Sequence, residues 1–316
     1  MSMTNDTLSP VAVVGAGALG CLFGGLLARA GATVTLIGRP QHVAAIQQDG
    51  LRFDSRGAQS IIPVAATVDI AAVRGARLVL FCVKGSDTDE AARAMAPHLG
   101  RDAVVLSLQN GVDNVERIGA QVPNVVLPGL VYVAAQMAGP GSVQHTGGGN
   151  LTIGRPALLR GGDKIDRHLL EAIAAPFTGA GITVTISETI EADLWVKLVM
   201  NCAYNAISAL TGSQYGRMVA LAEIRAVMAD AVNEVVAVAA RKGIALPGNL
   251  VEKAIRLADG MPVTISSTAQ DLRRGRRTEI DHLNGYVVRQ GDALGVATPV
   301  NRTLNALIKL VESKAQ

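Results

Sequence analysis

The sequence predicts an α/β domain followed by an all-helical domain. Short aliphatic runs alternate with amphipathic helical stretches as far as about residue 187, and only helical patterns follow. Apolar residues fill 49% of the 316 positions and aromatic residues only 3%, a balance typical of buried parallel strands and the helices that cover them. A chain of this length suits two domains, which we place at residues 1–187 and 188–316.

The first domain contains five predicted strands: Val11–Val14, Thr33–Ile37, Leu78–Val83, Val104–Leu106 and Val125–Leu127. Helical segments lie between several of them: Cys21–Ala30, Gln41–Asp49, Thr88–His98 and Asp113–Gly119. This alternation indicates crossover connections within one parallel sheet. The glycine-rich segment Tyr132–Ile153 predicts an antiparallel addition, after which a helix over Lys164–Gly179 and a strand near Thr183–Ile186 complete the domain.

The second domain is predicted to contain helices only. Their expected ranges are Glu188–Leu210, Leu221–Lys242, Leu250–Leu257, Ser267–Arg274, Glu279–Leu294 and Asn301–Ser313. The first of these helices ends at Thr211-Gly212, and Gly243 is a predicted stop for the second.

The charge pattern argues against a nucleic-acid-binding protein. The formal net charge is only +3, and a dedicated nucleic-acid surface is usually more basic. The most basic cluster, Arg273–Arg277, has no interleaved aromatic residues for bases to stack on, and we interpret it as a solvated helix end or loop. The five histidines are scattered, so no metal site is predicted.

The chain is predicted to be cytoplasmic. Residues Met1 to Pro10 are polar and lack the apolar region of a signal peptide, and charged residues interrupt the longest apolar stretch, so no membrane span is expected. Cys21, Cys82 and Cys202 lie in apolar segments without CxxC or metal-ligand spacing, as suits a reducing compartment. The oligomeric state is left open, with a homodimer as one option.

A glycine motif predicts a dinucleotide site of the Rossmann type. Gly15-Ala16-Gly17-Ala18-Leu19-Gly20 follows the first strand and opens a helix. Glycines at these positions allow a tight turn, close approach of the backbone to a pyrophosphate and close packing of helix against strand. The amides at the start of the helix then face the phosphates. A glycine turn with a purely structural role is the alternative.

The end of the second strand indicates which cofactor binds. An NAD site usually has an acid there that accepts the ribose hydroxyls, whereas this chain has Gly38-Arg39. An arginine can pair bidentately with a 2′-phosphate, and we expect no nearby carboxylate that would repel that phosphate. The sequence therefore favours NADPH over NADH, unless Arg39 is only a surface residue.

Two further loops follow predicted strands at the same edge of the sheet, where open α/β sheets bind their ligands. One contains Lys84 and the other Asn110, and both are expected near the nicotinamide end of the cofactor. Asn110 precedes Gly111, so simple turn chemistry is the alternative explanation for it.

The long helix from Glu188 carries Lys197, Asn201 and Asn205 at intervals of four, so the three project from one face. Asparagine is a poor helix former, and this stripe makes better sense as a ligand-holding face than as a solvated side. Reduction of a ketone leaves an alkoxide that must receive a proton, which a lysine ammonium supplies. The alternative is a lysine that only pairs with Asp193.

A second polar set comprises Ser266, Ser267, Asp271, the segment Thr278–Asp281 with Glu279, and Asn284. Ser267 and Asp271 lie one helical turn apart. Acids at the start of a helix gain from its dipole. Helix capping therefore explains Thr278–Asp281 as well as a functional role does.

Together these segments resemble the ketopantoate reductase (2-dehydropantoate 2-reductase) family over essentially the whole chain. The resemblance rests on GAGALG, Arg39, VKGSDT with Lys84, QNGV with Asn110, and GPGSVQHTGGG. Its most specific elements are the helix WVKLVMNCAYNAISALTG and the tail SSTAQDLRRGRRTEIDHLNGYV.

The resemblance implies reduction of ketopantoate to pantoate with NADPH, a step in coenzyme A biosynthesis. It places the catalytic lysine at Lys197, the lysine near the nicotinamide at Lys84 and an acid close to the site at Asp271. It assigns substrate positioning to five residues: Asn110, Asn201, Asn205, Ser267 and Glu279. Ser267 and Asn110 would help to hold the substrate carboxylate, and one of the other three would meet its hydroxyl.

One departure from the family pattern concerns the substrate. Family sequences often have proline after the second asparagine, but here Ala206 follows Asn205, and Tyr204 adds bulk where smaller residues are common. A reductase of another small 2-keto acid is therefore the second hypothesis. A non-catalytic NADPH-sensing protein is the third; it would be expected to lose the proton donor, which this chain keeps.

Overall fold

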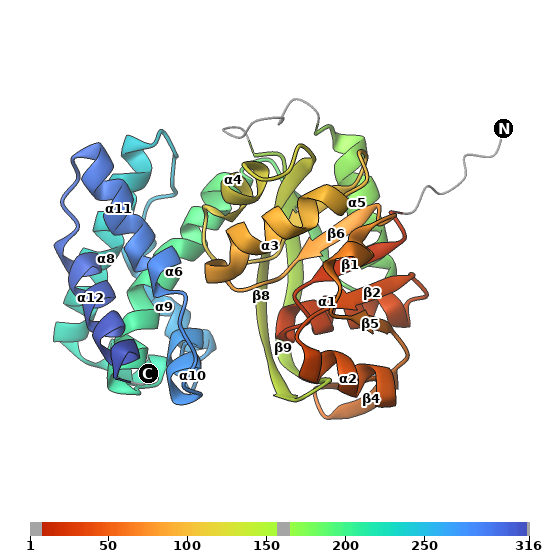
Figure 1. The fold of residues 1–316 in the computed structure, drawn as a ribbon. Coiled ribbons are helices and arrows are strands. Elements are labelled where there is room, and N and C mark those ends of the chain that lie inside the picture. Colours follow the sequence, from red (N-terminus) through yellow and green to blue (C-terminus); the bar gives the residue numbers. More distant parts are fainter. Residues whose placement is uncertain (1–7, 157–164, 315–316) are drawn as a thin grey trace. The chain divides into compact units, whose positions relative to one another are not determined.

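The computed structural model describes residues 8–156 and 165–314 (Figure 1). The chain forms two compact units, of which the first runs to Ile190 and the second begins at Glu191. The first unit contains the strands, and the described residues of the second contain only helices and the segments that join them. The predicted fold class, a Rossmann-type parallel sheet domain followed by an all-helical domain, is confirmed.

The sheet of the first unit has ten strands in the order β4-β3-β9-β8-β7-β6-β1-β2-β5, with β10 paired to β9. Its parallel part consists of β1 (Val11–Val14), β2 (Val34–Ile37), β5 (Ala65–Thr67), β6 (Leu78–Phe81), β7 (Val104–Ser107) and the start of β8 (Val125–Gly139). Four of these strands match the predicted ranges to within two residues at each end. The predicted Val125–Leu127 is the start of the much longer β8, and β5 was not predicted.

The antiparallel part of the sheet begins where β8 continues past β7. Its later residues pair antiparallel with β9 (Ser142–Gly154), as predicted for this segment, and β10 (Val184–Ser187) lies parallel to β9. A hairpin of β3 (Leu51–Ser55) and β4 (Ala58–Ile62) joins β9 through β3 and was not predicted. Only one residue of β4 is buried, so the hydrophobic alternation that indicates a strand is weak there.

Helices cover both faces of the sheet. They are α1 (Ala18–Arg29), α2 (Pro40–Asp49), α3 (Thr88–Met95), α4 (Asn114–Gly119) and α5 (Arg167–Gly179), with short 3₁₀ turns η1 (Ile70–Val73), η2 (Gly85–Asp87) and η3 (Ala96–His98). Val13 belongs to the same core as Phe23 of α1, and its neighbour Val14 to the same core as Met95 of α3. Successive strand residues thus face opposite sides, which explains the continuous apolar runs. The predicted start of α5, Lys164, lies outside the described residues.

The second unit is built around the long helix α6 (Ile190–Thr211). The other helices are α7 (Tyr215–Ala220), α8 (Ala222–Arg241), α9 (Leu250–Gly260), α10 (Ser267–Arg273), α11 (Asn284–Leu294) and α12 (Pro299–Ser313), with the 3₁₀ turn η5 (Ile280–His282). The predicted helix Glu279–Leu294 is therefore two elements, η5 and α11, and α7 was not predicted. No helix in the described ranges is long and apolar enough to cross a membrane.

A buried polar chain ties α6 to its neighbours. The side-chain Nδ2 of Asn284, at the start of α11, donates to the Cys202 carbonyl on α6 at 3.3 Å and to Asn301 Oδ1 at 2.9 Å. Asn301 in turn donates to the Glu234 carboxylate of α8 at 2.7 Å. Because unpaired buried polar groups are costly, these contacts fix the position of α6 within the unit.

Candidate active site

The glycine turn between β1 and α1 packs between the loops that follow β6 and β2. Gly15 has a φ of 106°, and a Cβ at this position would lie 2.7 Å from backbone atoms of Cys82 and Val83. The amides of Gly15 and Ala16 both donate to the Ile37 carbonyl at 2.9 Å. Only glycine fits the first position, because it needs both the left-handed conformation and the close approach.

The other two glycines have different surroundings. A Cβ on Gly20 would overlap the Gly15 carbonyl and lie 2.9 Å from the Val13 side chain, so this glycine serves helix–strand packing. A Cβ on Gly17 would meet no described atom within 4 Å. Gly17 is the N-cap of α1, whose first amides have no acceptor within the helix. An open position beside helix-terminal amides fits a pyrophosphate.

Arg39 lies directly after β2 and precedes α2, where it was predicted to meet a 2′-phosphate. Its side chain is 73% exposed. The expectation that no carboxylate lies nearby is wrong, because Asp87 Oδ2 is 3.8 Å from Arg39 Nη2. Asp87 is distant from Arg39 in sequence, and the order β6-β1-β2 brings the two loops together around the glycine turn.

The loops that carry Lys84 and Asn110 leave neighbouring parallel strands at the same edge, as predicted. Gln109 bridges them, since its amide nitrogen donates to the Val83 carbonyl at 3.0 Å and to Thr88 Oγ1 at 2.7 Å. Ser107 donates to Gln109 Oε1 at 3.0 Å and fixes the orientation of that amide. Gln109 and Thr88 are both buried.

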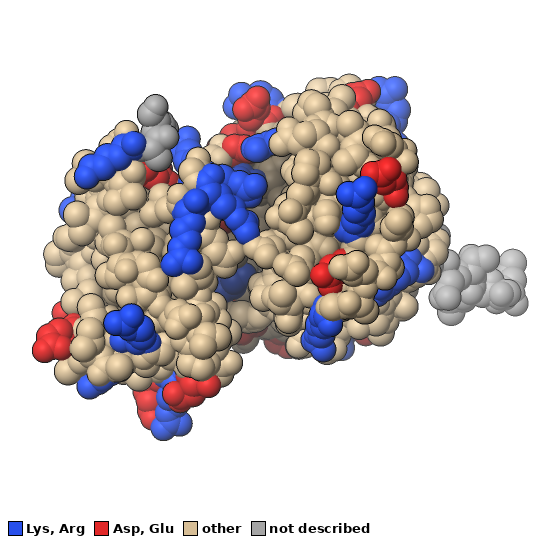
Figure 2. All heavy atoms as spheres, turned by 90° about the horizontal axis from the view of Figure 1, so that it is seen from below, with Lys and Arg blue, Asp and Glu red and all other residues tan. Residues whose placement is uncertain are grey.

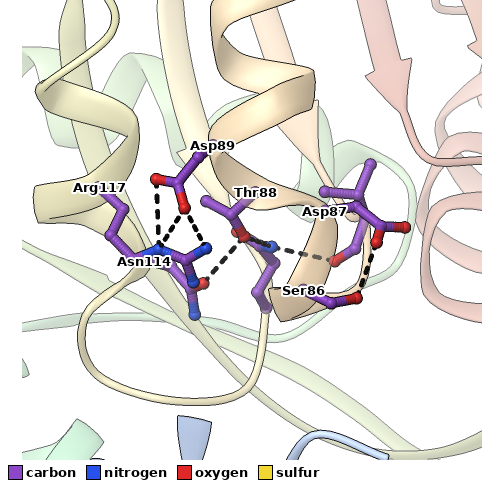
Figure 3. Close-up of polar contacts among 8 residues, drawn as sticks. Ser86, Asp87, Thr88, Asp89, Asn114 and Arg117 are labelled. Atoms are coloured by element: carbon purple, nitrogen blue, oxygen red, sulfur yellow. Dashed lines mark hydrogen bonds and ion pairs between the residues drawn. The ribbon is translucent and has the colours of Figure 1, made fainter. Parts of the chain in front are cut away.

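The same network continues from Thr88 to Asn114 (Figure 3) and from Asn114 to the backbone of Asn110. Thr88 donates to Asn114 Oδ1 at 3.2 Å, and Asn114 Nδ2 donates to the Asn110 carbonyl at 2.7 Å. Gly111 has a φ of 96°, so Asn110 does precede a turn. The roles of these three polar residues, Gln109, Thr88 and Asn114, were not predicted from the sequence, because their partners are set by the tertiary structure.

An ion pair holds the two helices behind this network together. Arg117 of α4 donates from Nη2 to the Asp89 carboxylate of α3 at 2.6 Å and from Nε at 3.2 Å (Figure 3). Both contacts go to Asp89 Oδ2, and Nε also lies 3.4 Å from Oδ1, so the guanidinium reaches both carboxylate oxygens.

The second unit presents the predicted polar face of α6. Lys197 and Asn201 are half-buried, and Asn205 is buried. Burial lowers the pKa of Lys197 to about 8, whereas the Glu279 carboxylate acts to raise it. A half-buried ammonium with a shifted pKa and a buried amide differ from the solvated side of a surface helix.

Glu279 and the segment before α10 approach α6 from other parts of the helical unit. Glu279 is buried, at 8% exposure, and its carboxylate is the one that acts on Lys197. Its neighbour Thr278 stabilises the turn before η5, since its hydroxyl accepts from the Ile280 amide at 3.2 Å. Glu279 is the N-cap residue of η5, but its carboxylate makes no capping bond there, so capping does not explain the burial of Glu279.

Ser266 belongs to the second predicted polar set, where it had no predicted role of its own, and the structure shows its role to be structural. Its hydroxyl accepts from the Ala269 amide at 3.0 Å, which caps α10, and donates to the Asn205 carbonyl at 3.0 Å. Its own amide donates to Ser208 Oγ at 3.2 Å. Ser266 therefore fastens the start of α10 to α6 beside Asn205, and the predicted substrate residue Ser267 follows it with an exposed side chain.

The arginine cluster that follows α10 is exposed at all four of its positions: Arg273, Arg274, Arg276 and Arg277. Arg273 donates to the Gly212 carbonyl at 3.3 Å, and Arg277 lies 3.7 Å from Asp281. Figure 2 shows basic and acidic groups interspersed on a largely uncharged face. Asp271 is buried, and its carbonyl accepts from the Arg274 and Arg276 amides.

Tyr204 belongs to the helical core. Its hydroxyl donates to the Ala254 carbonyl of α9 at 2.6 Å, and its ring packs on Tyr215 with centroids 4.2 Å apart. Its bulk is therefore used to pack α6 against α7 and α9. The residue that departs from the family pattern thus has a structural explanation.

Comparisons with known proteins place these features in one family. A family model described as "Ketopantoate reductase PanE/ApbA" matches residues 11–157, and one described as "Ketopantoate reductase PanE/ApbA C terminal" matches residues 189–312. The chain belongs to the ketopantoate reductase family. In residues 8–156 and 165–314, no three His, Cys, Asp or Glu residues are grouped so as to hold a metal ion.

Relatives in the ketopantoate reductase family align over nearly the whole chain. The 2-dehydropantoate 2-reductase of Halobacterium salinarum is 36% identical over 308 residues, which cover 96% of this chain and 98% of the relative. A PanE/ApbA family ketopantoate reductase structure from Ralstonia eutropha is 49% identical, with a TM-score of 0.90 and coverage of 97% of this chain and 99% of the other.

A solved structure with a different substrate is also similar. The ternary structure of D-mandelate dehydrogenase with NADH and anilino(oxo)acetate has a TM-score of 0.87 at 26% identity, and the match covers 96% of this chain and 99% of the other. The same architecture thus occurs in proteins named ketopantoate reductase and in one named D-mandelate dehydrogenase, which was solved with NADH.

Proposed function

We propose that this chain is a cytoplasmic reductase that converts ketopantoate to pantoate with NADPH, a step in pantothenate and coenzyme A biosynthesis. The observation that carries the proposal is the lowered pKa of Lys197, on a partly buried helix face in a chain of the ketopantoate reductase family. A pKa of about 8 leaves the ammonium protonated at neutral pH and able to release its proton.

The chemistry needs a proton at one atom, the ketone oxygen. Bound NADPH supplies the hydride that reduces the ketone carbon. Lys197 donates its proton to the oxygen as negative charge develops there, which leaves a hydroxyl and a neutral amine that regains a proton from solvent. Glu279 stabilises the ammonium form of Lys197 before the reaction.

The substrate and the cofactor have separate sets of residues. Ser267 and Asn110 help to hold the substrate carboxylate, and Asn201, Asn205 or Glu279 meets its hydroxyl. The cofactor is held by the glycine turn, Arg39, Lys84 and Asn110: the amides at the start of α1 contact the pyrophosphate, and Arg39 pairs with the 2′-phosphate.

A second candidate function is the reduction of another small 2-keto acid. It is favoured by the similarity to D-mandelate dehydrogenase, whose TM-score of 0.87 is close to that of the Ralstonia eutropha ketopantoate reductase. The proton donor and the mechanism would be unchanged, and only the protein residues that contact the substrate side chain would differ.

A substrate panel separates the two candidates. Initial rates of NADPH oxidation are measured with ketopantoate, with branched 2-keto acids that lack its 4-hydroxyl, and with the aromatic 2-keto acid that corresponds to mandelate. We expect kcat/KM for ketopantoate to exceed the others by at least roughly tenfold, because a site that binds a hydroxyl discriminates strongly against its absence. A preference for an acid without the 4-hydroxyl overturns the first candidate, and tight NADPH binding without turnover supports a sensing protein.

A further inference from the structure

Two loops place opposite charges on either side of the glycine turn. β1 lies between β2 and β6 in the sheet, and Arg39 follows β2 while Asp87 follows β6. Arg39 Nη2 and Asp87 Oδ2 are 3.8 Å apart, with side chains 73% and 47% exposed. A carboxylate is thus present at the cofactor edge of the sheet, although none follows β2.

Asp87 is held in this position by local contacts. Its amide donates to the Lys84 carbonyl at 2.8 Å within η2, and its carboxylate accepts from Ser86 Oγ at 2.7 Å (Figure 3). Asp87 is the N-cap residue of α3, and no side-chain capping bond to that helix engages its carboxylate. The charge of Asp87 therefore faces the Arg39 side of the loop without a role in capping α3.

Such an exposed ion pair contributes little to the stability of the fold. It can nevertheless change the affinity for a charged ligand that binds Arg39. A phosphate that binds Arg39 carries about two negative charges near neutral pH, and it would come close to the Asp87 carboxylate, which repels it. A ribose 2′-hydroxyl at the same place is neutral, and a carboxylate can accept a hydrogen bond from it, as the acid after the second strand does in NAD sites.

We propose that Asp87 is a specificity-determining residue that reduces the preference of this site for NADPH over NADH. It lowers the affinity for the 2′-phosphate by repulsion and by competition for Arg39, and it supports NADH as an acceptor for the ribose hydroxyl. This inference rests on the proposed function, in which Arg39 pairs with the 2′-phosphate of NADPH.

The test is the change in cofactor affinity on Asp87→Asn, which removes the charge and keeps an oxygen that can accept from Ser86. Dissociation constants of NADPH and NADH are measured by calorimetry for the wild-type protein and the variant. We expect the ratio of the NADH to the NADPH dissociation constant to rise about 3–10-fold, as for the loss of a like charge at close range in a solvated site. The change should shrink at high salt, since salt screens exposed charges.

Two controls make the result decisive. Asp102→Asn removes one charge in an exposed turn before β7, at the opposite edge of the sheet, and should leave the ratio unchanged. Arg39→Ala tests the proposed function separately, because it should weaken NADPH and leave NADH nearly unchanged. An unaltered ratio in Asp87→Asn, in a protein whose NADPH binding does depend on Arg39, overturns the inference alone. Equal losses of both cofactors in Arg39→Ala overturn the underlying cofactor assignment.

Discussion

The cofactor edge of the sheet and the polar face of α6 differ in what they require of their residues. At the glycine turn the requirement is the absence of side chains, because the backbone of Gly15 touches the next loop and Gly20 packs against β1. On α6 the proposed requirement is one particular side chain, the Lys197 ammonium, whose pKa depends on its surroundings. The glycine turn therefore depends on backbone geometry, and the proposed role of α6 depends on the chemistry of one side chain.

This difference determines how each region responds to substitution. The glycine turn is altered by substitutions that add a side chain, and the effect appears in the stability of the fold or in cofactor affinity. A site that depends on one titratable group is altered by removing that group or changing its pKa, and the effect appears in turnover and its pH dependence. Substitutions in the two regions should therefore affect different measurements.

The largest expected effect is that of Lys197→Ala. Loss of the proton donor should lower kcat by at least ~10²-fold, as for other general acids, and change NADPH affinity little. Single-turnover rates with saturating NADPH, together with the thermal unfolding midpoint, separate lost chemistry from lost structure. Near-normal turnover in a folded variant would show that the polar face of α6 does not depend on Lys197 as a proton donor.

The glycine turn allows a matched pair of alanine substitutions. Gly17→Ala adds a methyl group where no described atom lies within 4 Å, so the fold should be retained while NADPH affinity falls roughly tenfold or more, as for a lost hydrogen bond to a charged group. Gly20→Ala adds it against the Gly15 carbonyl and should destabilise the fold by about 1–3 kcal/mol. Calorimetric binding and chemical denaturation test both. Unchanged NADPH affinity in a folded Gly17→Ala protein would show that Gly17 does not face the pyrophosphate.

Glu279→Gln tests how the neighbouring carboxylate sets the pKa of Lys197. The Glu279 carboxylate raises the pKa of Lys197, so its removal should lower that pKa below about 8. Because the donor must be protonated, the decline in reduction rate with rising pH should begin at a lower pH in the variant. Rate profiles from pH 6 to 10 measure the change, and a shift to higher pH would contradict the assigned electrostatics.

The smallest expected effect comes from Ser266→Ala. It removes the cap of α10 and the bond to the Asn205 carbonyl, and should cost about 1–2 kcal/mol of unfolding free energy. Ser267→Ala is the matched control, since its exposed side chain should affect KM for the keto acid and leave stability unchanged. Denaturation measures the unfolding free energy, and steady-state kinetics measure KM. A raised KM in Ser266→Ala together with lost stability in Ser267→Ala would contradict the roles assigned to the two serines.

Sequence patterns predicted the buried parallel strands and most helices well, because apolar runs and glycine positions depend on local requirements. They missed β4, where a single residue is buried, and α7, which is only six residues long. They also identified Arg39 without its neighbour Asp87, and Ser266 without the hydrogen bonds that join it to α10 and α6. The structure adds those partners because tertiary contacts join residues that are far apart in the chain.

The most direct test of Lys197 as the proton donor is the pH dependence of kcat/KM for keto acid reduction by the wild-type protein. Because burial lowers the pKa of Lys197 to about 8, the rate should be constant below that pH and fall about tenfold per unit above it. A rate that stays constant well beyond pH 9 would contradict the assignment of Lys197 as the donor.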